Sequence, residues 1–215
     1  MLMNYNFIAV GGQNGASTDF PLYVYHDEMN GVTKTPNLSP SIVSELESRV
    51  GRSVKPEEVF GWVYGVLHSG AYREKYKEFL KVDFPWVPWP RDVEEFVAVS
   101  ALGWQLAQIH VKADFPEARD VKWKGDGGRD VEKARWSDGA VWVNAASRFE
   151  GVDEATWAQW IGGYQPLQKW LKDRKHRTLS PTDISHYKRM VQALRRTREL
   201  MSQIDALHPS WTATE

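Results

Sequence analysis

The chain has 215 residues, eleven tryptophans, six histidines, no cysteine and a formal net charge of −1. The lack of cysteine excludes disulfides and thiolate-bound metals, and the scattered histidines show no zinc-binding spacing. Residues 1–10 lack the pattern of a signal peptide, and no apolar run reaches the ~18 to 20 residues of a membrane helix, so we expect no membrane contact and a cytoplasmic location.

The N-terminal region is expected to contain two short strands, at residues 6–10 and 20–25, because aromatic and β-branched residues are enriched there. A loop with three glycines, residues 11–19, joins them. It is not a phosphate loop, since no Lys-Ser or Lys-Thr follows the glycines. A plain hairpin connection and a base-contacting loop are both compatible with this pattern. The polar stretch after the second strand, residues 26–40, is expected to form turns.

Helices are predicted for most of the next seventy residues. The first begins at Ser41 and ends at Gly51, and the second begins at Pro56 and ends at Ser69. A third is expected at residues 71–80 and a long one at residues 91–111. Residues 83–90 contain three prolines and are therefore predicted to be extended.

The region from residue 114 to residue 137 is rich in charged residues and glycine. We expect a surface β-hairpin that turns at residues 126–128. Lys122, Lys124 and Arg129 could alternatively reach a nucleic-acid backbone. Two further strands are predicted, at residues 140–144 and 157–161.

The C-terminal stretch carries the strongest helix start and the densest positive charge. Ser180, Pro181 and Asp183 provide an N-cap, a proline at the first helical position and a carboxylate one turn in, so the helix should begin at Pro181. Between Tyr164 and Asp205 there are ten basic and four acidic residues, a local balance of +6. This charge fits either a polyanion-binding face or a solvated helix face.

No catalytic motif is complete in the sequence. Walker, nucleophile-elbow and methyltransferase motifs are all absent. His68 and His110 lie at predicted helix ends, where a structural role is expected, and His186 should point to solvent. The sequence therefore favours a binding module over an enzyme.

Three blocks of sequence, in this order, resemble the C-terminal specificity domain of type ISP restriction-modification enzymes. The blocks are FPLYVY (residues 20–25), EEVFGWVYGVLHSGAYREKYKEFLKVDFPWVPWP (57–90) and IGGYQPLQKWLKDRKHRTLSPTDISHYKRMV (161–191). In that family of bacterial defence enzymes, nuclease, motor, adenine methyltransferase and target-recognition domains follow one another in one polypeptide.

The resemblance implies a domain that reads double-stranded DNA for methyltransferase and motor or nuclease domains located elsewhere. It implies that S-adenosylmethionine, ATP and Mg²⁺ belong to those domains, and that this chain holds no cofactor, metal or catalytic residue. Such a domain needs cations for the phosphates and polar groups for the base edges. The phosphate candidates are Arg73, Lys75, Lys169, Lys172, Arg174, Lys175 and Arg177. The base-reading candidates are Gln13, Asn14, Ser17, Thr18, Lys122, Lys124 and Arg129.

The expected fold is α+β, like a target-recognition domain, with a mainly helical lobe and a smaller β-containing lobe. We predict one domain over residues 1–215, with residues 1–56 and 114–162 in the β-containing part and residues 57–113 and 163–206 in the helical part. Two other functions stay open. In one, an aromatic surface around Trp86, Trp89 and Trp170 docks onto a partner domain without direct DNA reading. In the other, the chain is a stand-alone enzyme with an unrecognised site.

Overall fold

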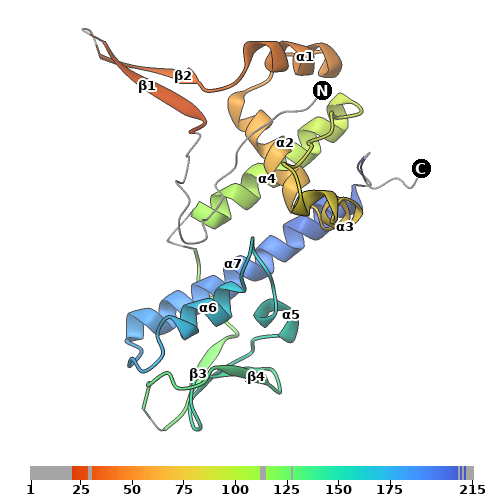
Figure 1. Ribbon diagram of the computed structural model, residues 1–215. Coiled ribbons are helices and arrows are strands. Elements are labelled where there is room, and N and C mark those ends of the chain that lie inside the picture. The colour runs from red at the N-terminus through yellow and green to blue at the C-terminus, as the bar shows by residue number, and fades with distance from the viewer. Residues whose placement is uncertain are drawn as a thin grey trace. The chain divides into compact units, whose positions relative to one another are not determined.

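A computed structural model describes residues 21–28, 31–111, 115–126, 128–207, 209 and 211. The predicted strand at residues 6–10 and the loop with Gln13, Asn14, Ser17 and Thr18 lie outside these residues. The chain forms two units: unit 1 contains residues 1–108 and 200–215, and unit 2 contains residues 109–199. These boundaries differ from those of the two predicted lobes, whose assembly into one domain stays a prediction. Helices and two small antiparallel sheets confirm the α+β class (Figure 1).

Unit 1 begins with a two-stranded ribbon, β1 (Tyr23–Glu28) and β2 (Gly31–Pro36). The predicted strand is thus present but starts three residues later than Phe20. The predicted turn region was wrong in part, because Val32, Thr33 and Thr35 in β2 pair with β1. These three β-branched residues suit a strand, although every β2 residue is exposed.

The helices of unit 1 follow the predicted order. They are α1 (Pro40–Val50), α2 (Pro56–His68), α3 (Gly70–Lys75), a 3₁₀ turn (Phe79–Lys81) and α4 (Val93–Val111), whose last residues belong to unit 2. α1 ends as predicted at Gly51, whose φ of 69° suits glycine. The third helix is shorter than predicted, because α3 ends at Lys75 and only a 3₁₀ turn follows.

Close packing of α2 against α4 forms the centre of unit 1. A Cβ added at Gly103 would lie 1.9 Å from the carbonyl oxygen of Gly61, so only glycine permits this approach. The extended segment 83–90 packs here as well. The Trp62 indole donates to the carbonyl of Pro88 (3.0 Å), and the Tyr72 hydroxyl donates to the carbonyl of Trp86 (2.7 Å). As predicted, the segment forms no helix.

Unit 2 contains a four-stranded antiparallel sheet in the order β3-β6-β5-β4. Its strands are β3 (Lys122–Lys124), β4 (Arg135–Ser137), β5 (Ala140–Trp142) and β6 (Arg148–Glu150). Its helices are α5 (Glu154–Trp157), α6 (Pro166–Lys172) and α7 (Pro181–Ala206), of which α7 ends in unit 1. Figure 1 shows α6 beside the first half of α7.

Two of the predicted β elements in unit 2 were wrong. The expected hairpin in residues 114–137 does not form, because β3 pairs with β6 and β4 pairs with β5. Packing decides this pairing: the Trp123 ring contacts that of buried Phe149, with centroids 4.9 Å apart. The expected strand at residues 157–161 does not form. Trp157 is instead the last residue of α5, whose N-cap Asp153 accepts from the Thr156 N–H at 2.9 Å. The strand predicted at residues 140–144 is confirmed as β5.

The sheet of unit 2 packs on the apolar faces of α6 and α7. Phe149 of β6 contacts Tyr187 of α7, with ring centroids 4.3 Å apart. Leu167 and Leu171 of α6 are fully buried in the same core, as is Val191 of α7. α7 therefore turns an apolar stripe, which includes Tyr187 and Val191, towards this core.

Candidate nucleic-acid interface

The start of α7 is fixed by the predicted capping box. The Ser180 hydroxyl accepts from the Asp183 N–H (3.1 Å), and the Asp183 carboxylate accepts from the Ser180 N–H (2.9 Å). Hydrogen bonds from the Ser180 backbone and side chain, followed by contact with Arg174, lower the pKa of Asp183 below its ordinary value. The carboxylate therefore stays charged at the positive end of the helix dipole.

Arg174 ties the segment before α7 to α6. Its guanidinium lies 3.7 Å from the centroid of the Trp170 ring and 3.3 Å from the Asp183 carboxylate. It also donates to the carbonyl of Trp170 at 3.3 Å. The Arg174 guanidinium is thus engaged both by stacking on Trp170 and by the ion pair with Asp183, so its first role is structural.

Backbone hydrogen bonds join the segment after Arg174 to residues 129–131. The N–H of His176 donates to the carbonyl of Val131 (2.7 Å), and the N–H of Leu179 donates to the carbonyl of Arg129 (2.9 Å). An isolated antiparallel bridge between Asp130 and Thr178 lies between these bonds. The two segments, distant in sequence, thus run side by side at one edge of unit 2.

This edge carries four exposed cations, which we call the basic edge. Its members are Arg129, Lys172, Lys175 and Arg177. Within the described part of the chain, none of the four forms an ion pair. Exposed cations without acidic partners retain their full charge for an anionic ligand. The structure therefore brings together three phosphate candidates and one base-reading candidate.

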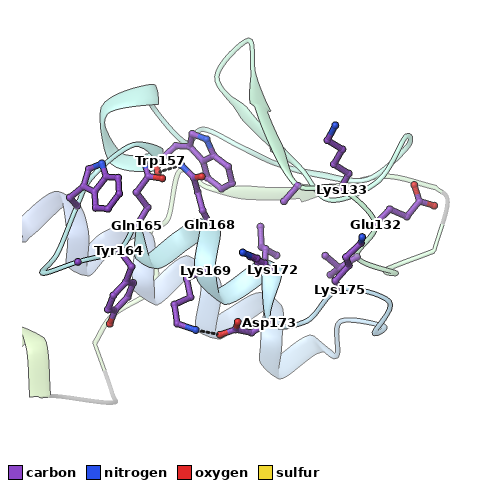
Figure 2. A pocket seen from close by; sticks show the side chains of 15 residues that line it. Glu132, Lys133, Trp157, Tyr164, Gln165, Gln168, Lys169, Lys172, Asp173 and Lys175 are labelled. Carbon is purple, nitrogen blue, oxygen red and sulfur yellow. Dashed lines mark hydrogen bonds and ion pairs between the residues drawn. The ribbon is translucent and has the colours of Figure 1, made fainter. Parts of the chain in front are cut away.

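A groove of about 710 Å³ adjoins the basic edge (Figure 2). One side is formed by residues 131–134, and the other by α6 and the segment before it. Figure 2 shows Gln168 pointing to Trp157 at one end of the groove, whereas Glu132, Lys133 and Lys175 lie at the other end. The groove-lining side chains used below are Trp160, Tyr164, Gln165, Gln168, Lys172 and Lys175. Aromatic, amide and cationic groups are thus combined in one hollow.

The other phosphate candidates do not join the basic edge as free cations. Lys169 lines the groove, but its ammonium pairs with the Asp173 carboxylate at 2.7 Å. Arg73 and Lys75 lie on α3 in unit 1, where Arg73 is half-buried and the Lys75 ammonium lies 5.8 Å from the Tyr76 ring centroid.

The base-reading candidates Lys122 and Lys124 lie on β3. Because strand residues alternate, both point to the face opposite Trp123, which packs towards the core, and both are exposed. Neither lines the groove. β3 and β4 are the two outer strands of the sheet, so these lysines present a separate surface of unit 2.

Three basic residues of α7, Lys188, Arg195 and Arg198, are paired with acids distant in sequence. Arg195 binds the Asp120 carboxylate with two hydrogen bonds of 2.8 and 2.9 Å. Arg198 binds Asp153 at 3.1 Å, and Lys188 lies 3.5 Å from Glu117. These contacts satisfy charges that the local sequence balance leaves unopposed.

The histidines singled out from the sequence have the expected surroundings. A ring nitrogen of His68 lies 2.9 Å from the carbonyl of Tyr64, and one of His110 lies 2.9 Å from the Thr197 hydroxyl. Burial lowers the pKa of His68. His186 is exposed, as predicted, and stacks on Trp170 with a centroid distance of 5.6 Å.

Sequence reasoning missed the groove itself. Trp157, Trp160, Gln165 and Gln168 were not among the candidates, and Lys133 was overlooked beside them. The available signal was local: two tryptophans and two glutamines precede or open a helix that starts at Pro166. Residues 131–134 carry no such signal.

In the part of the chain that the structure describes, no group of three or more His, Asp or Glu side chains is placed to hold a metal ion. No helix in that part combines the length and apolar character required to cross a membrane.

A family model described as the type ISP C-terminal specificity domain matches residues 2–203. A search of curated proteins found no match.

Solved structures that contain DNA or a DNA substrate mimic share the fold. The ATP-dependent Type ISP restriction-modification enzyme LlaBIII bound to DNA matches with a TM-score of 0.66 and 16% identity, over 86% of this chain and 14% of that one. The DrdV–DNA complex matches with a TM-score of 0.66 and 20% identity, over 84% and 21%. A nuclease-deletion mutant of the Type ISP enzyme LlaGI in complex with a DNA substrate mimic matches with a TM-score of 0.54 and 18% identity, over 79% and 14%. The chain thus spans 14 to 21% of the length of these proteins.

Proposed function

The chain belongs to the family of type ISP C-terminal specificity domains, and from this we propose that it positions duplex DNA for an adenine methyltransferase and restriction machinery carried by other domains. The structural neighbours were solved with DNA or a DNA mimic, which supports DNA as the ligand. In this proposal S-adenosylmethionine, ATP and Mg²⁺ act in the other domains. We assign no catalytic residue to this chain.

The basic edge is the observation that carries the proposal. Arg129, Lys172, Lys175 and Arg177 are exposed and form no ion pair among the described residues, whereas most cations of α7 are paired. Unpaired cations bind phosphates through release of condensed counterions, a contribution that is independent of base sequence. The basic edge would therefore set the position of the duplex rather than its sequence.

Salt-dependent binding tests this proposal. Labelled duplex DNA is titrated with the full chain at several salt concentrations, first with the parent and then with Lys172→Ala/Lys175→Ala/Arg177→Ala. Each lost phosphate contact should reduce the slope of log K against log salt by about 0.9. The slope of the triple variant should therefore be smaller than that of the parent by about 2.7. Its affinity should fall on all duplex sequences alike.

A charge-matched control separates contact from net charge. Arg49→Ala/Lys77→Ala/Lys81→Ala also removes three positive charges, but from unit 1 side chains that pair with Glu45, Glu74 and Glu78. We expect its salt slope to match that of the parent. No duplex binding by the parent at low salt contradicts the proposal, as does an equal loss of slope in both variants.

A docking function is favoured by a different observation, in segment 83–90 and its surroundings. Val82, Phe84 and Trp86 are 82%, 52% and 53% exposed, which is high for apolar side chains in one short stretch. Of the other two tryptophans of the predicted surface, Trp89 lies under Arg49 and Trp170 packs on the core of unit 2.

In the docking function, Val82, Phe84 and Trp86 would contact a neighbouring domain of the larger enzyme. A methyltransferase fragment should then co-purify with the chain and be lost on Phe84→Ser/Trp86→Ser, and co-purification that survives this change contradicts docking through the segment.

A further inference from the structure

We propose that the groove of unit 2 binds an unstacked nucleotide of single-stranded or locally unpaired DNA, with the base on the exposed rings and the phosphate on the lysines. The inference depends on the proposed function only in taking DNA as the ligand. It adds a second ligand form, because the basic edge alone fits a duplex backbone.

Two aromatic side chains that line the groove are unusually exposed to solvent. Trp160 is 56% exposed and Tyr164 is 42% exposed, and both line the groove. Each ring leaves a large apolar area in water that a stacked base would cover. Bases inside a duplex are already stacked on one another, so only an unpaired base can offer its face to these rings.

Two amides of the groove are fixed in place by backbone contacts. The side-chain nitrogen of Gln165 donates to the carbonyl of Ala158 (3.1 Å), and that of Gln168 donates to the carbonyl of Trp157 (3.4 Å). An amide has two N–H donors and an oxygen acceptor, so one donor and the oxygen of each glutamine are left for a ligand. That combination matches the donor and acceptor pattern of an exposed base edge.

The charges of the groove select an anion. Lys169 and Asp173 neutralise each other, and Glu132 offsets one of the remaining lysines, Lys133, Lys172 and Lys175. The lining thus keeps a positive balance, concentrated on Lys172 and Lys175 where the groove meets the basic edge. A phosphodiester of the same strand, farther along the groove than the stacked base, would lie against these two ammonium groups (Figure 2).

The dimensions agree with a ligand of nucleotide size. A hollow of about 710 Å³ is within the ~300 to 1,000 Å³ typical of small-ligand sites. It can hold a nucleotide that leaves the base stack, whereas a whole double helix can only lie across its rim.

Three labelled DNAs test the inference on the full chain: a single-stranded oligothymidine, a perfect duplex, and the same duplex with one unpaired thymidine. The parent should bind the single strand and should prefer the bulged duplex to the perfect one. Trp160→Ala/Tyr164→Ala should weaken single-strand binding about tenfold or more and remove the preference, because a stacked base is lost. Its affinity for the perfect duplex should stay unchanged.

Two further variants guard this test against misfolding and general apolar effects. Trp160→Phe/Tyr164→Phe keeps both rings and should keep most of the single-strand affinity. Tyr25→Ala removes an exposed ring from unit 1 and should change nothing in these three titrations.

The outcomes separate this inference from the proposed function. Duplex binding without single-strand binding, or equal affinity for bulged and perfect duplexes, overturns the groove inference and leaves the proposed function standing. Single-strand binding without duplex binding overturns the proposed function and keeps the groove. Unchanged single-strand affinity in Trp160→Ala/Tyr164→Ala overturns the inference and points to a protein contact for these rings.

Discussion

Helix α7 and the segment from Lys172 to Arg177 both carry many cations, yet the structure places them in opposite electrostatic situations. On α7, Arg195 is only 19% exposed and binds Asp120, while Arg198 binds Asp153. In the segment, Lys172, Lys175 and Arg177 are exposed and have no acidic partner among the described residues. Positive charge on α7 stabilises unit 2, whereas positive charge in the segment remains for a ligand.

A local charge balance therefore does not identify a binding face. The balance of +6 between Tyr164 and Asp205 counts paired and unpaired cations alike. The acids that pair with Lys188, Arg195 and Arg198 are Glu117, Asp120 and Asp153. They lie outside that window, and only the fold brings them near. A cation that stabilises the fold is distinguished from one that is free to bind a ligand only by whether it has an acidic partner.

Loss of Arg195 should give the largest effect on stability. Arg195→Ala leaves the Asp120 carboxylate and the carbonyl of Gly151 without their shared donor, and because Asp120 is 63% exposed we expect a loss of about 1 to 2 kcal/mol in the free energy of unfolding. Urea unfolding at pH 7 measures it. Arg196→Ala is the matched control, since Arg196 pairs with Glu199 of the same helix, and it should cost under about 0.5 kcal/mol. Equal losses in the two variants would mean that the long-range pairing of α7 carries no special stability.

The charge of Asp153 should make the stability of unit 2 depend on pH in the acidic range. Burial acts to raise the pKa of Asp153, but hydrogen bonds from Thr156 and contact with Arg198 outweigh it and lower the pKa to about 2. Because the folded pKa is depressed, the stabilisation is present above the unfolded pKa of about 3.9 and is lost as pH falls towards 2. The side chain is 43% exposed, so screening reduces the contribution to about 1 kcal/mol.

Comparison with Asp153→Asn isolates this contribution, since asparagine can still cap α5. The parent should be more stable than the variant at pH 7, and the gap should close between pH 4 and pH 2. Urea unfolding across that range measures the gap. A constant gap would show that the charge of Asp153 is not the cause.

Local signals allowed the sequence to predict many helix boundaries. Ser180, Pro181 and Asp183 marked the start of α7, and Gly51 marked the end of α1, because caps depend on a few adjacent residues. Strand pairing was not predictable in the same way. Trp123 of β3 is paired with Phe149 of β6, and both pack on a core that includes α7. No residue near Trp123 in the sequence indicates that partner.

The candidate site was predicted only in part for the same reason. Lys172, Lys175 and Arg177 stand close together in sequence and were found, and Arg129 was found for a base-reading role. Its place beside Arg177 depends on the bridge between Asp130 and Thr178, which charge patterning does not reveal. The groove depends on the same meeting of distant segments.

Neighbouring cations in one segment provide the sharpest test of the difference between paired and unpaired charge, although the expected effects are the smallest. Arg174 is 27% exposed, stacks on Trp170 and contacts Asp183, so Arg174→Ala should destabilise the fold by about 1 kcal/mol and change duplex affinity by less than about twofold. Lys175 is exposed and unpaired, so Lys175→Ala should leave stability within about 0.5 kcal/mol while reducing the salt slope by about 0.9. Urea unfolding and DNA titration on both variants measure the four quantities. If Arg174→Ala reduced the salt slope more than Lys175→Ala did, ion pairing would not determine which cation binds the phosphate. The position of each cation alone would then determine it.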